Sequence, residues 1–414
     1  MALTPQQLSR VLGYLVEESG LKFPQVDNTV ELLREGATVP FIARYRKERT
    51  GELDEVQIRS LEERLAYFGE LEERKVTVLK TIEELGKLTP ELKGRIEATR
   101  QKTELEDLYL PYKPKRRTKA TIARERGLEP LAALIAAQQL QCGTPEEAAA
   151  PFVDPEKDVP DAAAALAGAG HILAEGLSED ADARALVRQL TWEQGIFCSL
   201  VAAEQAKAVT KFEMYYDYQE PLKVIPSHRM LAMRRGEKEE VLRLSITAPE
   251  AEILLRLKAR LLKGESIFRP LLEAVAEDAY RRLIAPSIEV ELRLEAKKKA
   301  DEAAIEVFAQ NLKNLLLLPP AGGKRVLGVD PGMRTGSKLA VVDGTGKFLE
   351  HVTIYPHTGE SRVPQAKKDL LRMVQAHAIE MVAIGNGTGS REMDRFIRDT
   401  LKEAGLHVTT VVVN

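Results

Sequence analysis

The sequence contains few cysteines, one tryptophan and no long apolar run. Its 414 residues include two cysteines, Cys142 and Cys198, and aromatic residues make up 5% of the chain. Two cysteines do not form the disulfide framework of a small secreted protein, and they suit a reducing compartment. Clean apolar runs such as Leu315–Leu318 are too short to cross a bilayer, and the first residues lack a basic and an apolar signal region. We therefore expect a cytoplasmic protein without a membrane partner.

The chain also lacks a net positive charge. Its formal net charge is -3, which excludes a globally basic nucleic-acid binder, so any such surface must be local. Hydrophobic residues make up 44% of the chain and can build real cores, while the 30% of charged residues favour a soluble, helix-rich protein. A chain of this length predicts roughly two to four domains.

A segment rich in proline and glycine, Pro319–Gly323, marks the clearest domain boundary. Helical spacing dominates before it, including a long charged helix from about Leu53 to Leu85, although Phe197–Leu222 has no regular pattern. After Gly323 the apolar period becomes that of strands, and the order βββαβαβ predicts a mixed α/β sheet. We expect a mostly α-helical body in two parts, residues 1–125 and 126–320, followed by the α/β domain at 324–414.

Two segments concentrate positive charge. In the first, basic residues crowd around Tyr45, and in the second, Pro111–Arg126, seven Lys/Arg face the single acid Glu125, a net charge of +6. Such cations neutralise phosphates, and interleaved tyrosines stack on unpaired bases. The alternative is a solvated face, or ion pairs with the many glutamates of the chain. The predicted nucleic-acid contacts are Arg44, Arg46, Lys47, Arg49, Tyr112, Lys113, Lys115, Arg116, Arg117, Lys119 and Arg229.

A carboxylate follows the first strand of the α/β domain. The apolar run Val326–Val329 ends on Asp330, and the loop behind it contains Gly332, Thr335 and Gly336. A carboxylate held at a strand end can grip a divalent cation such as Mg²⁺ or Mn²⁺, so Asp330 is the candidate catalytic residue. The simpler interpretation is a turn aspartate that closes the strand. Neither a dinucleotide fingerprint nor a phosphate-loop lysine motif occurs, so we expect no small-molecule cofactor.

Several separated stretches resemble the Tex family of bacterial transcription accessory proteins. They are Val39–Glu48, Asp107–Ala120, Pro226–Ala232, Gly328–Gly336 and Ile384–Thr388. The resemblance spans the whole chain. It implies a helix-turn-helix-like N-terminal region, a long helical body and a YqgF-type domain with the RNase H-like fold of RuvC-type resolvases. Because the family continues with helix-hairpin-helix repeats and an OB-fold RNA-binding domain, the resemblance implies an N-terminal portion that ends inside the RNase H-like domain.

The resemblance also implies a role in transcription as a scaffold that binds RNA, in single-stranded form, or DNA. RNase H-like nucleases need several carboxylates around two metal ions. Asp330 matches the first, but Asn386 stands where the second belongs, and Glu392 is the nearest substitute. We therefore expect a domain without catalysis. The alternatives are a metal-dependent nuclease or resolvase acting through Asp330, and a protein-interaction platform for RNA polymerase or other transcription or translation machinery.

Overall fold

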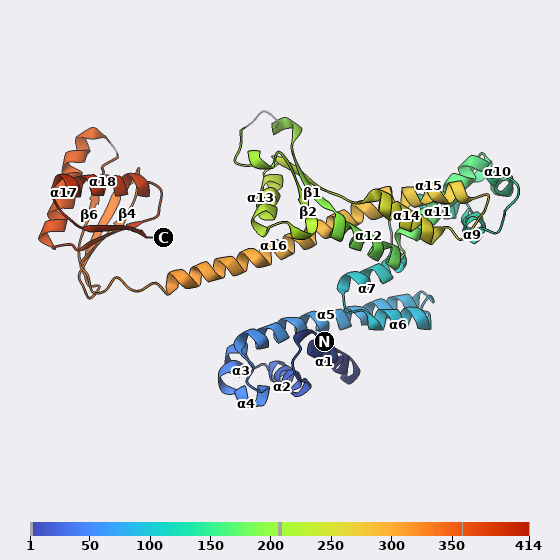
Figure 1. Ribbon diagram of the computed structural model, residues 1–414, viewed down its shortest axis with the longest axis horizontal. Helices are drawn as coiled ribbons and strands as arrows, with labels where there is room; N and C mark the ends of the chain where they lie inside the picture. Colours follow the sequence, from blue (N-terminus) through green and yellow to red (C-terminus); the bar gives the residue numbers. More distant parts are fainter. Residues whose placement is uncertain (1–2, 206–208, 358, 414) are drawn as a thin grey trace. The chain divides into compact units, whose positions relative to one another are not determined.

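The computed structural model describes residues 3–205, 209–357 and 359–413 (Figure 1). The chain forms two compact units, Met1–Val307 and Phe308–Asn414, and the boundary falls inside one long helix. A mostly helical body precedes a small domain with a mixed sheet, which confirms the predicted fold class. In the described part of the chain, no helix is both long and apolar enough to span a bilayer.

The N-terminal part of the first unit is built from helices around one apolar core. They are α1 (Pro5–Ser19), α2 (Phe23–Arg34), α3 (Val39–Tyr45), α4 (Lys47–Thr50), α5 (Glu55–Glu84), α6 (Pro90–Ala98), α7 (Lys102–Tyr109) and the 3-10 turn η1 (Leu110–Tyr112). The helix α1 starts at Pro5 because Thr4 and Gln7 form a reciprocal capping box. The long charged helix expected near Leu53–Leu85 is α5, whose buried stripe includes Ile58, Leu61 and Phe68.

A charged cluster is buried inside this core. The side chains of Lys75 and Glu72 are 2% and 1% exposed, and their Nζ and Oε1 atoms lie 2.8 Å apart. The second oxygen of Glu72 accepts a hydrogen bond from Arg10 at 2.7 Å, and Lys75 also donates to the carbonyl of Glu97 at 3.0 Å. Since every buried charge has a partner, the cluster ties α1, α5 and α6 together.

Short helices and turns follow, packed closely by small residues. They are α8 (Lys119–Glu125), α9 (Glu129–Ala137), α10 (Pro145–Ala149), η2 (Ala150–Phe152), η3 (Pro155–Lys157), α11 (Ala162–Ser178) and α12 (Ala181–Gln194). In α11, a Cβ atom at Gly168 would lie 2.3 Å from a methyl carbon of Leu128. The alanine- and glycine-rich composition of this region therefore permits close helix approach.

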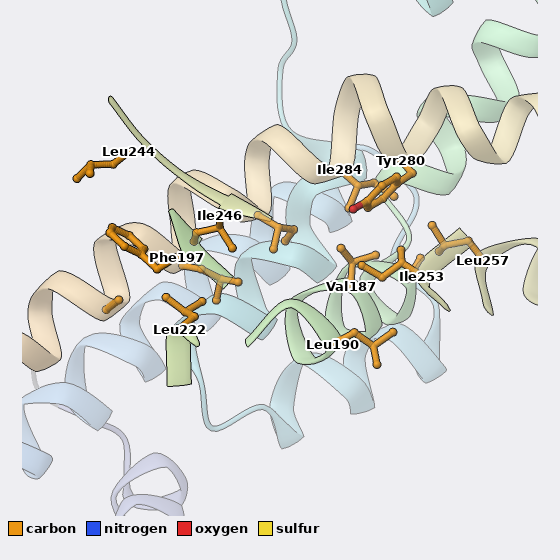
Figure 2. Close-up of a cluster of buried hydrophobic side chains, with 14 of the residues drawn as sticks. Val187, Leu190, Phe197, Leu222, Leu244, Ile246, Ile253, Leu257, Tyr280 and Ile284 are labelled. Carbon is orange, nitrogen blue, oxygen red and sulfur yellow. The ribbon is translucent and has the colours of Figure 1, made fainter. Parts of the chain in front are cut away.

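A three-stranded antiparallel sheet and more helices complete the first unit. In chain order these elements are β1 (Ile196–Val201), η4 (Ala203–Gln205), η5 (Glu213–Tyr215), β2 (Asp217–Pro221), η6 (Leu222–Val224), α13 (Ser227–Lys238), β3 (Leu242–Thr247), α14 (Glu250–Leu261), α15 (Arg269–Asp278), the π-helical turn η7 (Ala279–Ile284) and α16 (Ala285–Leu316). The strand order is β2-β1-β3. Figure 2 shows this core, which includes Phe197 and Ile246 of the sheet, Val187 of α12 and Ile253 of α14.

The π-helical turn η7 lies between α15 and α16 and has a local cause. Pro286 is the second residue of α16, so it has no N–H to donate to the carbonyl of Arg282, and its ring would clash with that carbonyl in a regular helix. A wider turn just before the proline relieves the clash. The buried face of α16 then continues through Ile288, Leu292 and Ala296.

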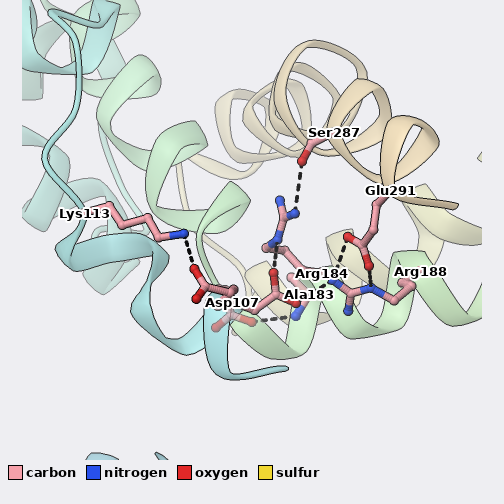
Figure 3. Close-up of polar contacts among 9 residues, drawn as sticks. Asp107, Lys113, Ala183, Arg184, Arg188, Ser287 and Glu291 are labelled. Atoms are coloured by element: carbon pink, nitrogen blue, oxygen red, sulfur yellow. Dashed lines mark hydrogen bonds and ion pairs between the residues drawn. The ribbon is translucent and has the colours of Figure 1, made fainter. Parts of the chain in front are cut away.

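A polar joint links α7, α12 and α16 within the first unit (Figure 3). The buried carboxylate of Asp107 accepts hydrogen bonds from Arg184 at 2.5 Å and from Arg188 at 2.6 Å. Arg184 also donates to Ser287 at 3.0 Å, and Arg188 forms an ion pair with Glu291. The two arginines of α12 thus connect Asp107 on α7 to the start of α16.

The second unit contains a five-stranded sheet with helices after its third and fourth strands. Its elements are β4 (Val326–Asp330), β5 (Ser337–Val342), β6 (Phe348–Ile354), η8 (Glu360–Arg362), α17 (Val363–Ala376), β7 (Met381–Gly385), α18 (Ser390–Glu403) and β8 (Thr409–Val413). The strand order is β6-β5-β4-β7-β8; the pairs of β4 with β7 and of β7 with β8 are parallel, and the other pairs are antiparallel. This is the predicted order βββαβαβ.

Candidate nucleic-acid interface

Carboxylates of the same chain neutralise most of the predicted basic segment Pro111–Arg126. The ion pairs join Lys113 to Glu106, Lys115 to Glu175 and Glu179, Arg117 to Glu125, Arg124 to Glu175, and Arg126 to Asp158. Apart from Glu125, these acids lie outside the segment in sequence. The fold therefore supplies the ion pairs that the sequence left open as the alternative interpretation of this segment.

Glu175 on α11 is the centre of this pairing. Its side chain is 8% exposed and accepts hydrogen bonds from Arg124 at 2.7 Å and Thr118 at 2.8 Å. Burial raises the pKa of this carboxyl, but the hydrogen bonds from Arg124 and Thr118 and the charge of Lys115 outweigh it and leave the pKa below its ordinary value. At Glu179 burial dominates and the pKa is raised, although Lys115 opposes this shift. These pairs hold the segment on α11.

Arg116 and Lys119 are exposed and, within the described ranges, form no ion pair. The tyrosines of this segment are less available than the sequence suggested. Tyr109 is only 9% exposed, with the ammonium group of Lys113 5.5 Å from its ring centre, and Tyr112 is half-buried. The predicted contacts at Tyr112 and along the segment stay predictions, but two free cations remain instead of seven.

The α3–α4 surface is a second basic region, defined by the exposed side chains of Phe41, Arg44, Tyr45, Arg46 and Lys47. It forms because α3 is amphipathic: Val39, Ile42 and Ala43 are buried in the N-terminal core, and the opposite side of the helix faces solvent. Arg46 leaves the helical conformation with φ -132° and ψ 23°, and α4 starts at the next residue. The chain therefore bends here and presents its basic residues outward.

The cations of the α3–α4 surface differ from those of Pro111–Arg126 in their neighbours. Among the residues that the structure describes, Arg44, Arg46 and Lys47 form no ion pair with a carboxylate. The nearby Arg49 does, with Glu31 at 2.7 Å and Glu35 at 4.0 Å. Glu48 is the acid closest in sequence and is exposed. Of the four predicted contacts in this region, three are thus left available to an external anion.

Two aromatic rings lie among these cations and were not among the predicted contacts. Phe41 and Tyr45 occupy positions i and i+4 of α3, with ring centres 5.5 Å apart and planes tilted by 46°. The guanidinium carbon of Arg46 lies 4.9 Å from the ring centre of Phe41, and its Nη1 donates to the carbonyl of Tyr45 at 3.0 Å. The i, i+4 spacing beside buried Ile42 is the sequence signal that would have identified both rings.

Arg229, the remaining predicted basic contact, is paired. Its Nη1 atom donates to the hydroxyl of Tyr218 at 2.8 Å and lies 3.0 Å from a carboxylate oxygen of Glu220. The hydrogen bond and charge of Glu220 raise the pKa of Arg229 above its ordinary value. This arginine holds α13 to β2, and its role as an external contact stays a prediction.

Asp330 lies at the end of β4, where the neighbouring strand β7 also ends. Asp330 is opposite Lys338 in the register of β4 with β5, and Val329 is beside Ile384 in the parallel register of β4 with β7. The residues after Ile384 therefore reach the same edge of the sheet, and the backbone N–H of Asn386 donates to Val413 at 3.0 Å. The sheet therefore brings the backbone of Asp330 and of Asn386 to the same edge, and their role in a site stays a prediction.

The loop behind Asp330 is tightly folded. The backbone N–H of Gly332 donates to the hydroxyl of buried Ser337 at 3.2 Å. A Cβ atom at Gly332 would lie 2.3 Å from the carbonyl oxygen of Gly336, and Thr335 lies in the same turn. Gly336 has φ +82°, and a Cβ there would lie 2.5 Å from the ring of Tyr355. The loop glycines are thus required by the backbone path.

The donor atoms at this edge do not match a two-metal site. In the part of the chain that the structure describes, no group of three or more His, Cys, Asp or Glu side chains is arranged to hold a metal ion. Asp330 supplies one carboxylate, Asn386 brings an uncharged amide, and Glu392 is exposed on α18. A hard divalent cation prefers several charged oxygen ligands, so the residues present do not fit the metal pair of an RNase H-like nuclease.

Comparison with protein families gives three matches that follow one another along the chain. Residues 9–83 match the Tex-like protein N-terminal domain, residues 141–308 match the Tex central region, and residues 324–414 match the YqgF-like domain of Tex protein. The matches cover the N-terminal helices, most of the helical body and the five-stranded sheet.

Comparison with curated proteins gives relatives over nearly the whole chain. Protein YdcI of Bacillus subtilis, described as uncharacterized, is 44% identical over all of this chain and 57% of its own length. The transcriptional accessory protein Tex of Neisseria gonorrhoeae is 43% identical over 98% of this chain and 53% of its own length. A human S1 RNA-binding domain-containing protein is 28% identical over 90% of this chain and 38% of its own length. The chain spans about half the length of its bacterial relatives.

Proposed function

The chain belongs to the Tex family, and we propose that it acts in transcription as a nucleic-acid-binding scaffold, with RNA as the first candidate ligand and DNA as the second. The observation that carries the proposal is the α3–α4 surface. Its Arg44, Arg46 and Lys47 form no ion pair within the described residues, so the phosphates of a nucleic acid can pair with these three side chains. Phosphate contacts release counterions, which makes the affinity depend steeply on salt.

The relatives support this proposal through their names. One bacterial relative is a transcriptional accessory protein, and a human relative contains an S1 RNA-binding domain. A place in the cytoplasm, beside RNA polymerase, follows if the chain shares the role of the transcriptional accessory protein. RNA polymerase is accordingly the proposed protein partner.

The test is a binding titration at several salt concentrations with the Arg44→Ala/Arg46→Ala/Lys47→Ala variant. A fluorescein-labelled oligouridylate serves as the probe. Each lost phosphate contact reduces the slope of log affinity against log salt by about 0.7 for a single strand, so three lost contacts reduce it by about 2. The triple variant should bind more weakly at low salt and converge with the parent as salt rises.

The matched control removes the same charge from cations that the fold already pairs. In the Arg59→Ala/Arg95→Ala/Arg281→Ala variant each lost cation has an acidic partner, Glu55, Asp182 or Glu250. This variant should leave the slope nearly unchanged. Equal effects of the two triple variants would mean that net charge, not the α3–α4 surface, governs binding.

For the RNase H-like domain we propose binding without cleavage. The support is the single carboxylate Asp330 at an edge where Asn386 is uncharged. The test incubates the protein and its Asp330→Asn variant with labelled RNA and branched DNA in the presence of Mg²⁺ or Mn²⁺. No cleavage by either form is the expected result. Cleavage by the parent that Asp330→Asn abolishes would establish the nuclease alternative instead.

A further inference from the structure

The ring pair of the α3–α4 surface lies outside the apolar core of the N-terminal helices. Phe41 and Tyr45 are 39% and 66% exposed, while the core-facing side of the same helix is filled by Val39, Ile42 and Ala43. An exposed ring forgoes the free energy that its burial would contribute. Among the contacts between Phe, Tyr or Trp rings in the described residues, this is the pair with both rings exposed.

From this geometry we infer that Phe41 and Tyr45 form a stacking platform for unpaired bases, so that the α3–α4 surface takes a single strand rather than a duplex. The inference rests on the proposed function and names the ligand class of that surface. Aromatic side chains stack on the faces of bases that have left a helix, whereas a duplex hides those faces. The platform can therefore contribute to binding of single strands only.

The position of Arg46 fits this use. Its guanidinium group lies over Phe41 and is held by a hydrogen bond to the carbonyl of Tyr45. This contact fixes a positive charge next to the ring pair, close to where the backbone of a stacked strand would pass. Arg44 and Lys47 flank the rings in sequence and supply further phosphate contacts.

A protein partner is the competing occupant, since exposed aromatic residues and arginines are also common at protein interfaces. The charges favour nucleic acid. Three cations without a carboxylate partner stand beside the rings, against one exposed acid, Glu48. By contrast, Arg49, Arg64 and Arg95 of the first unit pair with acids of the same chain.

The test separates stacking from charge by the Phe41→Leu/Tyr45→Leu variant, which keeps apolar bulk and every charge. Binding is measured with the oligouridylate and with a mixed-sequence RNA duplex, each at two salt concentrations. Stacking on an aromatic ring changes affinity for a single strand by roughly tenfold per base, so the variant should lose at least that factor for the oligouridylate. Its salt slope and its affinity for the duplex should stay as in the parent.

Two further variants serve as a control and as a direct probe of stacking. Phe348→Leu removes an exposed ring on β6 and should change neither affinity. Tyr45→Trp should retain binding, and the added indole emission should be quenched when the oligouridylate binds. Equal loss of single-strand and duplex affinity in the double leucine variant would overturn the inference while leaving the proposed function in place.

The remaining outcomes are also decisive. Unchanged oligouridylate affinity in the double leucine variant, with weaker capture of purified RNA polymerase, would assign the rings to a protein interface and overturn the inference. A parent protein that binds neither nucleic acid probe would overturn the proposed function and this inference together. Selective loss of the single strand, with quenching at Tyr45→Trp, supports both.

Discussion

The carboxylate of Asp107 on α7 lies 2.6 Å from a guanidinium nitrogen of Arg188 on α12, and both side chains are largely withdrawn from water. The other oxygen of Asp107 is held by Arg184, so one acid orients two arginines. Residues far apart in sequence thereby form the joint between the N-terminal helices and the body of the first unit.

We predict that Asp107→Asn destabilises this joint. Removing one partner of a buried ion pair costs about 3–5 kcal/mol, and here Arg184 is left buried without a carboxylate, while Arg188 keeps Glu291. The measurement is urea unfolding followed by amide hydrogen exchange of α7 and α12. Asp182→Asn is the control, since its pair with Arg95 also links α6 to α12 but both side chains are about half exposed. It should cost no more than about 1 kcal/mol.

A second prediction concerns the buried pair Lys75 and Glu72. Glu72→Leu alone leaves a buried ammonium group and should destabilise the N-terminal helices by about 3–5 kcal/mol. Lys75→Met alone leaves the Glu72 carboxylate paired with Arg10, so it should destabilise them by less. The double variant Glu72→Leu/Lys75→Met should be much closer to the parent, because an apolar pair fills the same space without charge. If urea unfolding shows that the double variant loses the sum of the two single-variant losses in unfolding free energy, this coupling is contradicted.

A third prediction follows from Glu350 on β6. Hydrogen bonds from Arg372 and then from His377 lower the pKa of this carboxyl from 4.5 to about 2. Because the folded-state pKa is depressed, the stabilisation is fully present above pH 4.5 and is lost as the pH falls toward 2. The protection factors of the backbone amides in β6 and α17, which are corrected for the intrinsic pH dependence of exchange, should fall over this range. Glu350→Gln should remove the part of the pH dependence that belongs to this contact.

A fourth prediction uses two glycines with similar backbone angles. Gly336 and Gly346 have φ +82° and +86°, but a Cβ at Gly336 would clash with Tyr355 and Thr353, whereas nothing lies within 4 Å at Gly346. Gly346→Ala should cost about 1–2 kcal/mol from backbone strain alone. Gly336→Ala should add about 1–3 kcal/mol for overpacking. The measurement is the unfolding temperature of the second unit in the two variants. Equal decreases in this temperature would mean that the loop around Gly336 moves to make room for the added methyl group.

The sequence predicted the second unit well because its signals are local. Each strand from β4 to β8 is an apolar run or an alternating one, and the turn at Asp343–Gly346 separates β5 from β6. The strand β2 of the three-stranded sheet was not predicted, for the opposite reason. This edge strand reads Asp-Tyr-Gln-Glu-Pro, which has no apolar alternation, and it pairs with β1 only through the tertiary fold.

The candidate interface shows where sequence reasoning reaches its limit. Counting charge along Pro111–Arg126 could not reveal that Glu175 and Glu179 fold back onto Lys115, because that pairing depends on how α11 packs. The residues of the α3–α4 surface had the weaker charge run, yet they retain more unpaired cations. A local charge density predicts a binding surface only when the rest of the chain leaves it unpaired.

The π-helical turn Ala279–Ile284 sets the angular phase of everything that follows it in α16. The wider turn advances the chain by less per residue than the about 100° of an α-helix, so it takes up about one extra residue while α16 keeps its phase. A single-residue insertion in the regular helix directly after this turn would instead rotate the rest of α16 by about 100°. Ile288, Leu292, Ala296 and Ala300 would then turn away from the core, and Ser287 and Glu291 would leave Arg184 and Arg188. The π-helical turn thus accommodates an extra residue beside Pro286 while one face of α16 stays aligned with both the apolar core and the arginines of α12.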